Sequence, residues 1–222
     1  MNILSVQPAA LAAGALFDVP VAFGVADPCA PASPLYPQEA RAIGQARRKR
    51  RREFAAGRAA ARGAMVALGL SPTEVPMGPD RAPVWPQGIC GSISHTETQC
   101  LAVVGRRADV RALGLDIEPA TPLDPALWSE VCTPTELDAL LTRPTGEWGV
   151  LARAVFCVKE AAYKAQYPIS RTLFGFEMLE TRIASGAFTA RFVGSVPGFP
   201  AGTELRGRLI RQGGVFLAGV AV

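Results

Sequence analysis

The sequence predicts an α/β (α+β) fold with a long helix and several strands in each half of the chain. Its 222 residues can form one large domain or two halves of about 100 residues each. Hydrophobic residues make up 49% and charged residues 19% of the chain, which is enough apolar surface for a buried core. Two long segments have helical periodicity, and several short apolar segments between Gly and Pro residues have the pattern of strands.

The first half begins with a predicted strand and continues into a predicted helix. Residues 19–25 are apolar and precede prolines at positions 28, 31, 34 and 37, which predicts an edge strand followed by an extended loop. Residues 38–68 are rich in Ala and Arg, and their apolar side chains recur at helical spacing. Gly69 follows as a stop signal. We therefore expect one helix over this whole segment.

A proline-rich loop leads to three predicted strands. Residues 89–93 and 101–104 are strand-like, and the polar residues 96–99 between them have the composition of a turn. Residues 110–117 form the third predicted strand.

The second half contains two predicted helices and then four predicted strands. The run Thr133-Pro-Thr-Glu136 has the spacing of an N-cap with a capping box, so a helix is expected to begin near Pro134. Residues 148–167 form the second long helix, with Pro168 as its expected end. The predicted strands are residues 177–183, 188–193, 205–210 and 215–222.

Composition excludes several classes of protein. No stretch approaches the roughly 18 consecutive apolar residues of a membrane-spanning helix, and no basic residue precedes the first apolar run as in a secretory signal. The five cysteines are an odd number without a C-x-x-C pair, which argues against a disulfide framework. His95 is the only histidine, so a zinc site of the Cys/His type has too few ligands. We expect a cytoplasmic protein, and any metal should be a hard, oxygen-bound ion.

Two acidic residues close the third predicted strand, in the run Gly114-Leu-Asp-Ile-Glu118. Residues two apart on a strand face the same side, so Asp116 and Glu118 should project together. Two adjacent carboxylates repel each other unless a cation lies between them, and Mg²⁺ prefers such oxygen ligands. The alternative is a strand end at which both acids simply face water.

A second cluster lies within the second long helix. Glu160 and Lys164 are four residues apart and share a face, which is also the spacing of an ordinary surface ion pair. The chain has twenty arginines and only three lysines, yet Lys159 and Lys164 both flank this glutamate. Because an amine can take part in proton transfer as well as bind phosphate, this lysine usage favours a functional role.

Two further clusters lie in the first half. Gly91-Ser-Ile-Ser94-His95 combines small residues with hydroxyl and imidazole groups that suit phosphate oxygens, although a lone loop histidine is often only solvated. Nine of the 23 basic residues lie between Arg41 and Arg62, including six consecutive cations at 47–52. This segment indicates an anionic partner, or else the solvated face of a helix.

Taken in this order, the clusters resemble the 4'-phosphopantetheinyl transferases of the surfactin-synthetase and enterobactin-synthetase-component-D type, and most of all the actinobacterial representatives. The resemblance covers roughly residues 41–183. The motifs that carry it are Arg-Arg-Glu-Phe54 with Gly57-Arg58, Arg81-Ala-Pro-Val-Trp-Pro86, Gly91-Ser-Ile-Ser-His95, Gly114-Leu-Asp-Ile-Glu118 and Phe156-Cys-Val-Lys-Glu-Ala-Ala-Tyr-Lys-Ala165. Phe156 stands where many relatives have Trp, and Met77 where some relatives have a cation.

The resemblance implies a pseudo-dimer of two similar α/β halves with coenzyme A in the cleft between them. Residues 1–113 would be the half with the basic helix, which binds the 3'-phosphate, and the Ser-His loop. Residues 114–222 would be the half with the acids and the Lys-Glu helix. It assigns Asp116, Glu118 and Glu160 to Mg²⁺, and Glu160, Lys164 and Lys159 to catalysis. The residues it assigns to coenzyme A are Arg50, Arg58, Arg81, Ser94, His95, Lys159 and Lys164.

The implied reaction transfers 4'-phosphopantetheine from coenzyme A to a serine hydroxyl of an apo acyl or peptidyl carrier protein and releases 3',5'-ADP. Glu160 is the expected base, with Lys159 or Lys164 as the alternative. We expect a monomer whose partners are coenzyme A and acidic carrier domains, without nucleic acid or membrane. Two alternatives stay open: a Mg²⁺-dependent nucleic-acid-binding protein or nuclease that uses the arginine run, and a homologue that lacks turnover.

Overall fold

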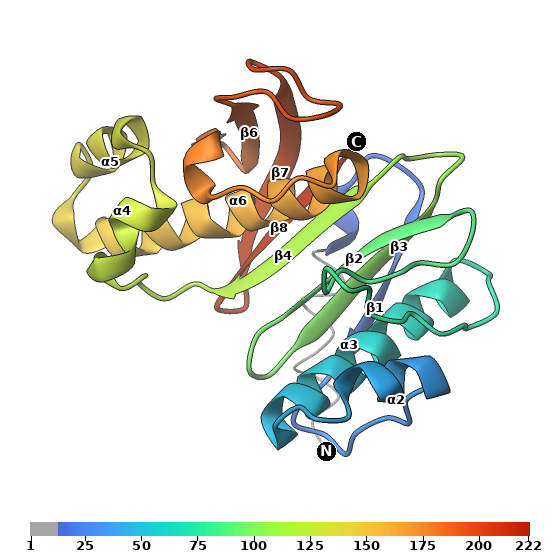
Figure 1. Cartoon of the computed structure of the whole chain (residues 1–222). Helices are drawn as coiled ribbons and strands as arrows, with labels where there is room; N and C mark the ends of the chain where they lie inside the picture. Colours follow the sequence, from blue (N-terminus) through green and yellow to red (C-terminus); the bar gives the residue numbers. More distant parts are fainter. Residues whose placement is uncertain (1–12) are drawn as a thin grey trace. The chain divides into compact units, whose positions relative to one another are not determined.

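The chain divides into two units, Met1–Leu113 and Gly114–Val222. This division has the same boundary as the one proposed from the sequence. The computed structural model describes residues 13–222 (Figure 1).

The first unit is a small antiparallel sheet with a long helix packed on it (Figure 1). Its strands are β1 (Val21–Ala26), β2 (Ile89–His95) and β3 (Cys100–Arg106), in the order β1-β3-β2. Phe23 is paired with Val103, and Ser92 is paired with the same residue from the other side. The predicted edge strand and the predicted pair of strands are therefore confirmed.

The helix expected over residues 38–68 is two helices, α2 (Pro37–Ile43) and α3 (Arg48–Ala67). The prediction of one continuous helix was wrong at residues 44–47. Gly44 ends α2, and Arg47 has the extended backbone conformation (φ −59°, ψ 153°) of a residue that starts a new helix. Glycine is a poor helix former, which makes this the weakest point of the segment. α3 buries an alanine-rich face with Phe54 and Met65 against the sheet.

The second unit is a larger sheet in the order β4-β8-β7-β6-β5 with the long helix α6 (Trp148–Ser170) packed on it. Its strands are β4 (Leu113–Pro119), β5 (Leu179–Ala184), β6 (Ala187–Phe192), β7 (Glu204–Gln212) and β8 (Val215–Ala221). The short helices are α4 (Trp128–Val131), α5 (Pro134–Leu141), η3 (Pro125–Leu127), η4 (Thr145–Glu147) and η5 (Phe176–Met178), and the first unit contains η2 (Gly14–Leu16). The four predicted C-terminal strands and the capped helix at Pro134 are confirmed.

α6 does not end at Pro168 as predicted. The helix continues to Ser170, and Arg171 then adopts a left-handed conformation with φ 53° and donates its N–H to the carbonyl of Tyr167. Proline removes only one N–H donor, so its cost is small when it lies within the last turn of a helix that is closed by such a cap.

In each unit a strand glycine lets the long helix approach the sheet closely. A Cβ on Gly24 of β1 would lie 1.9 Å from the carbonyl oxygen of Ala60 in α3, and a Cβ on Gly114 of β4 would lie 1.9 Å from that of Ala161 in α6. Both neighbours are backbone atoms, which cannot move aside as a side chain can. The two units therefore use the same packing device at equivalent positions.

No helix within residues 13–222 is long and apolar enough to cross a membrane. All five cysteines carry free thiols, and only Cys29 is exposed.

Candidate active site

Asp116 on β4 and Glu160 on α6 share one cation, Lys164. Asp116 is only 2% exposed, and Nζ of Lys164 donates to its Oδ1 at 2.6 Å. The same ammonium lies 3.9 Å from Oε2 of Glu160. A buried carboxylate needs a compensating charge, and Lys164 supplies it to Asp116. The structure thus brings together three of the predicted site residues.

Glu118 pairs with Arg153 of α6, whose Nη1 donates to Oε2 at 2.9 Å. Burial, together with repulsion from Asp116, raises the pKa of Glu118 to about 7, although Arg153 acts in the opposite direction. A carboxyl group with this pKa is only partly ionised near neutral pH, so a further cation at this site would bind it favourably.

The pKa values of Glu160 and Lys164 decide which of the two groups can accept a proton. Burial raises the pKa of Glu160, an effect that Lys164 opposes and Asp116 strengthens. Burial also disfavours the ammonium of Lys164, but Asp116 and Glu160 outweigh it and raise the pKa of Lys164. A lysine that holds its proton more tightly is a poor base, whereas a carboxylate with a raised pKa is a better one. Of the two groups, Glu160 is thus the better proton acceptor, and Lys164 is the one that keeps its positive charge.

The three predicted metal-binding carboxylates do not form a ready-made cluster. Within residues 13–222, no group of three or more His, Cys, Asp or Glu side chains is arranged to hold a metal ion. Lys164 contacts Asp116 and Glu160, while Arg153 holds Glu118. The donor set nevertheless fits a hard divalent cation, because all three groups are carboxylates and two have a pKa raised by burial, which a bound cation would counteract.

The structure does not bring Lys159 to this cluster. Its side chain is fully buried and points toward the carboxylate of Glu136, 2.6 Å from Nζ. The carbonyls of Val131 and Phe176 accept its other two N–H bonds at 2.8 and 3.0 Å. An ammonium has three donors, so none is left for a phosphate or a proton-transfer step. All three donors of Lys159 are taken up inside the second unit, which argues against the predicted contact with coenzyme A and the predicted role as a base.

In the first unit, Arg50 of α3 meets His95 at the end of β2. Nη1 of Arg50 lies 3.4 Å from Nε2 of His95 and 3.8 Å from Oε2 of Glu53. His95 Nε2 lies 4.0 Å from the same carboxylate oxygen. Two predicted anion-binding residues thus lie side by side, and the carboxylate of Glu53 lies within 4.0 Å of both.

Arg58 is a buried guanidinium that has no carboxylate partner within the described part of the chain. The residue is 7% exposed, its Nε donates to the carbonyl of Val75 at 2.7 Å, and its guanidinium lies over the ring of Phe54 at 3.9 Å. Burial lowers the pKa of Arg58 to about 10. The charge of Glu39 opposes this shift, but a buried guanidinium without a direct ion pair remains costly and suits an anionic ligand.

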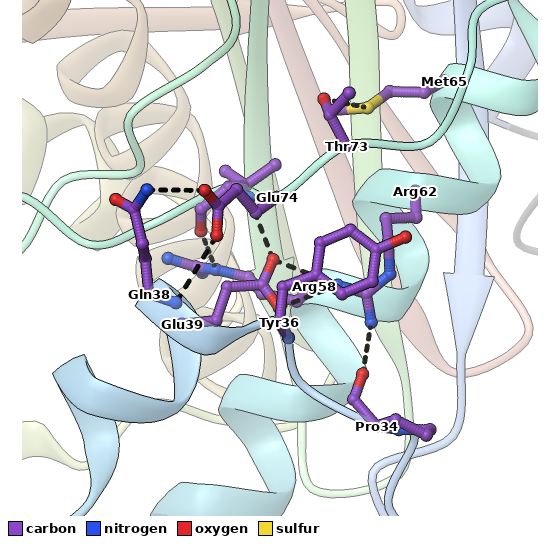
Figure 2. A network of polar contacts seen from close by, with 10 residues as sticks. Pro34, Tyr36, Gln38, Glu39, Arg58, Arg62, Met65, Thr73 and Glu74 are labelled. Carbon is purple, nitrogen blue, oxygen red and sulfur yellow. Dashed lines mark hydrogen bonds and ion pairs between the residues drawn. The ribbon is translucent and has the colours of Figure 1, made fainter.

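Arg62, one turn further along α3, has the partner that Arg58 lacks. Its Nη1 donates to both carboxylate oxygens of Glu39 at 3.0 and 2.8 Å. Glu39 is fully buried and also accepts from the backbone N–H groups of Tyr36 and Val75. Figure 2 shows this network, in which Glu39 joins α2 to α3 and to the loop before β2. The carboxylate of Glu39 thus has its partners inside the first unit.

The remaining two predicted site residues differ in burial. Ser94 is buried next to His95 on β2. Arg81 is exposed in the loop before β2, has a left-handed backbone (φ 67°), and its side chain forms no hydrogen bond or ion pair with residues 13–222. Among the described residues, Arg81 therefore has no side-chain partner that would compete with a ligand.

Sequence reasoning missed Arg153, Glu53 and Glu136. Arg153 had a signal: it lies seven residues before Glu160 and eleven before Lys164, which places all three on one face of the helix. Glu53 is the only acid between residues 41 and 62. Glu136 was identified only as a capping residue, and nothing in its spacing indicated its contact with Lys159.

Comparison with known proteins finds two family models on this chain. The model described as 4'-phosphopantetheinyl transferase N-terminal domain matches residues 38–105. The model described as 4'-phosphopantetheinyl transferase superfamily matches residues 112–205.

Curated relatives match over most of the chain. The 4'-phosphopantetheinyl transferase Svp of Streptomyces mobaraensis is 38% identical over 174 residues, which is 76% of this chain and 69% of that protein. The 4'-phosphopantetheinyl transferase PptT of Mycobacterium tuberculosis is 36% identical over 196 residues, 84% of this chain and 85% of that protein. Enterobactin synthase component D of Escherichia coli is 37% identical over 120 residues, 53% of this chain and 55% of that protein.

Proposed function

Because the chain belongs to the 4'-phosphopantetheinyl transferase family, we propose that it transfers the 4'-phosphopantetheine group of coenzyme A to a serine hydroxyl of an apo carrier protein. The observation that carries this proposal for the present chain is the arrangement of Lys164 between two carboxylates. Lys164 contacts both Asp116 and Glu160, so a proton acceptor and a phosphate-binding cation lie next to each other.

In the proposed reaction the serine oxygen of the carrier forms a bond to the β-phosphorus of coenzyme A. The bond from that phosphorus to the bridging oxygen breaks, and 3',5'-ADP leaves with the electron pair. Glu160 accepts the serine proton, a role supported by its exposure: its side chain is 28% exposed, whereas that of Asp116 is 3% exposed. Lys164 stabilises negative charge on the phosphate oxygens, a role supported by its retained proton.

Mg²⁺ is proposed as the metal, with Asp116, Glu118 and Glu160 as its ligands. When bound, it would neutralise charge on the pyrophosphate. The support comes from the donor set: three carboxylates, two of which have a raised pKa when no metal ion is bound.

Arg58, Arg50, His95 and Ser94 are proposed to bind the 3'-phosphate end of coenzyme A, with Arg81 as a further contact. Arg58 has the strongest support, because its buried guanidinium forms no ion pair within residues 13–222. Arg50 and His95 lie 3.4 Å apart and present donors to a common ligand.

The proposed partners are acyl or peptidyl carrier domains of fatty acid, polyketide or nonribosomal peptide synthesis. Their acidic surface around the serine would suit a protein with a formal net charge of +4. We propose that the protein acts as a monomer in the cytoplasm. The relatives reported above are transferases and synthase components, and none of them supports the alternative of a nuclease.

The test is to incubate the protein with an apo carrier protein, coenzyme A and Mg²⁺ and to follow the intact mass of the carrier. A gain of one phosphopantetheine group is expected, and a chelator should abolish it. Asp116→Ala and Glu160→Ala should each lower kcat/KM by about two to four orders of magnitude. An unchanged rate in either variant would contradict the assignment, and DNA cleavage without transfer would favour the nuclease.

A further inference from the structure

Lys159 and Glu136 form a fully enclosed ion pair in the second unit. Nζ of Lys159 lies 2.6 Å from Oε2 of Glu136, and their side chains are 0% and 4% exposed. The two remaining donors of Lys159 bond the carbonyls of Val131 in α4 and Phe176 in η5. One side chain of α6 is therefore joined to three other elements, α4, α5 and η5.

Glu136 extends this network to the sheet. Its Oε2 accepts the backbone N–H of Thr133 at 2.7 Å, and its Oε1 accepts the N–H and the hydroxyl of Thr181 in β5 at 2.6 and 2.5 Å. Both oxygens are thus saturated by groups from the start of α5, from α6 and from β5. α4 and α5 also pack directly on α6 (Figure 1).

The neighbour of Lys159 on α6 is Glu160. Consecutive helix residues project about 100° apart, so fixing the direction of one side chain fixes the direction of the next. Lys159 holds its side of α6 against α4, α5 and η5, while Glu160 and Lys164 face Asp116 of β4. A rotation of α6 that released Lys159 would also move Glu160 away from Asp116.

We propose that Lys159 and Glu136 are positioning residues for the transfer reaction: their buried ion pair sets the rotation of α6, which places Glu160 and Lys164 opposite Asp116. The proposal rests on the proposed function. Lys159 touches neither coenzyme A nor the carrier protein.

The first unit contains a similar buried ion pair between a short helix and the long helix, which supports a positioning role. Glu39 is the third residue of α2, as Glu136 is of α5, and both helices begin with proline. Glu39 pairs with Arg62 of α3, 23 residues later, and Glu136 pairs with Lys159 of α6, also 23 residues later. In each unit a buried glutamate joins a short helix to a basic side chain of the long helix.

The decisive experiment compares the single variant Lys159→Met with the double variant Lys159→Met/Glu136→Gln. The single change leaves a buried carboxylate without its cation, whereas the double change removes both charges and keeps an acceptor for Thr181. We expect the single variant to lose about 10- to 100-fold in kcat with little change in KM for coenzyme A. The double variant should recover to within about fivefold of the wild type. Thermal melts identify a variant that does not fold.

A contact between Lys159 and substrate predicts the opposite result. The double variant would then fold and remain as inactive as the single one, which overturns the proposal. Lys49→Met is the matched control, because Lys49 is exposed and pairs with Glu97 at the surface. If Lys159→Met does not fold, the double variant alone decides: transfer near the wild-type rate supports a positioning role, and a folded but inactive double variant overturns it.

Amine labelling gives a readout that does not depend on activity. The chain has only three lysines, Lys49, Lys159 and Lys164. Treatment of the folded protein with an N-hydroxysuccinimide ester should label Lys49 and, more slowly, Lys164, while Lys159 stays unmodified in peptide mass spectra. Coenzyme A should protect Lys164 alone. Labelling of Lys159 at the rate of Lys164 overturns the proposal, whereas an inactive wild type with protected Lys159 contradicts the proposed function and leaves the pair as a structural one.

Discussion

Arg58 and Arg62 lie one turn apart on α3, but their charges affect the stability of the fold in opposite directions. Arg62 pairs with the buried Glu39, whereas Arg58 is buried without a carboxylate. Arg62 therefore compensates a charge inside the fold. Arg58 instead carries a desolvation cost, and burial lowers its pKa to about 10. Its hydrogen bond to Val75 and its contact with Phe54 offset this cost only in part, which is why we propose an anionic ligand for Arg58.

Arg58→Met should therefore separate binding from stability. We expect KM for coenzyme A to rise about 10- to 100-fold, because a charge-assisted hydrogen bond contributes about 1.5 to 3 kcal/mol. The midpoint of thermal unfolding should stay unchanged or rise, since the variant removes a buried charge and keeps an apolar stem over Phe54. Steady-state kinetics and thermal melts measure both quantities.

Arg62→Met is the matched control on the same helix. It leaves the buried carboxylate of Glu39 without its cation, so the free energy of unfolding should fall by about 3 to 5 kcal/mol. Equal destabilisation by the two variants, with equal effects on KM, would contradict the different roles assigned to these arginines.

Glu118 makes the stability of the metal-free protein depend on pH. Its pKa is about 7 in the folded state and 4.5 when unperturbed, with burial as the main cause. Between these values the folded state binds more protons than the unfolded state, so the free energy of unfolding falls as the pH rises from about 5 to about 8. The pKa difference sets an upper limit of about 3 to 4 kcal/mol on the loss from this group, and solvent screening lowers the actual loss. Urea unfolding in the presence of a chelator measures it.

Glu118→Gln should flatten this pH profile without abolishing it. The residual slope comes from Glu160, whose pKa is raised in the same direction by burial. Excess Mg²⁺ should oppose the loss of stability at the alkaline side, because a cation favours the ionised carboxylates. A stability that rises from about pH 5 to about pH 8 without metal would show that these groups are not buried as the structure has them.

At the scale of elements, Gly114 sets how closely β4 and α6 approach. A Cβ at this position would lie 1.9 Å from the carbonyl oxygen of Ala161 and 2.8 Å from the backbone nitrogen of Ala165. Gly114→Ala must therefore push the helix away from the strand that carries Asp116. We expect a loss of about 1 to 3 kcal/mol or more in the free energy of unfolding, together with reduced transfer activity. Chemical denaturation and the carrier-protein assay measure the two effects.

Gly146→Ala is the control in the same unit, since a Cβ there would meet nothing within 4 Å. It should change the free energy of unfolding by less than about 0.5 kcal/mol. A Gly114→Ala protein as stable and active as this control would mean that the close approach of β4 and α6 is not needed.

Local sequence patterns predicted most elements, because their signals lie within a few residues of each other. The capping box at Thr133 and Glu136 is an example, and the structure has both of its hydrogen bonds. Errors arose where an element is decided by distant contacts or by a single weak residue. Gly44 split a predicted helix in two, and the cap at Arg171 carried α6 beyond Pro168.

The sequence predicted most of the charged residues of the candidate site, but not which of them form ion pairs with each other. The spacing of Asp116 and Glu118 on a strand placed both carboxylates near the same edge, yet each has its own cation in the structure. Lys159 illustrates the limit, because its neighbours in sequence gave no indication that Glu136 would take its charge. Which of two adjacent lysines faces the core depends on packing across α4, α5 and β5, which no local pattern encodes.

At the scale of the whole molecule, the six consecutive basic residues at 47–52 are the longest run of like charge in the sequence. Arg48 and Arg51 are exposed and form no ion pair with an acid in the described residues, while Lys49 is paired with Glu97. Unpaired surface charge of one sign attracts an oppositely charged partner over distances of about 10 Å, and salt screens this attraction.

Reversing this charge should slow the encounter with an acidic carrier protein and leave the chemical step unchanged. The variant Arg48→Glu/Arg51→Glu takes the formal net charge from +4 to 0, and we expect kcat/KM for the carrier to fall about tenfold at low salt while kcat stays within twofold. The control Arg182→Glu/Arg191→Glu changes the net charge equally, at exposed positions of the second unit. Transfer rates measured over a range of ionic strength should fall steeply for the wild type and only slightly for the α3 variant. If both double variants lose the same amount, net charge and not this segment steers the partner, and if neither responds to salt, the encounter is not electrostatically driven.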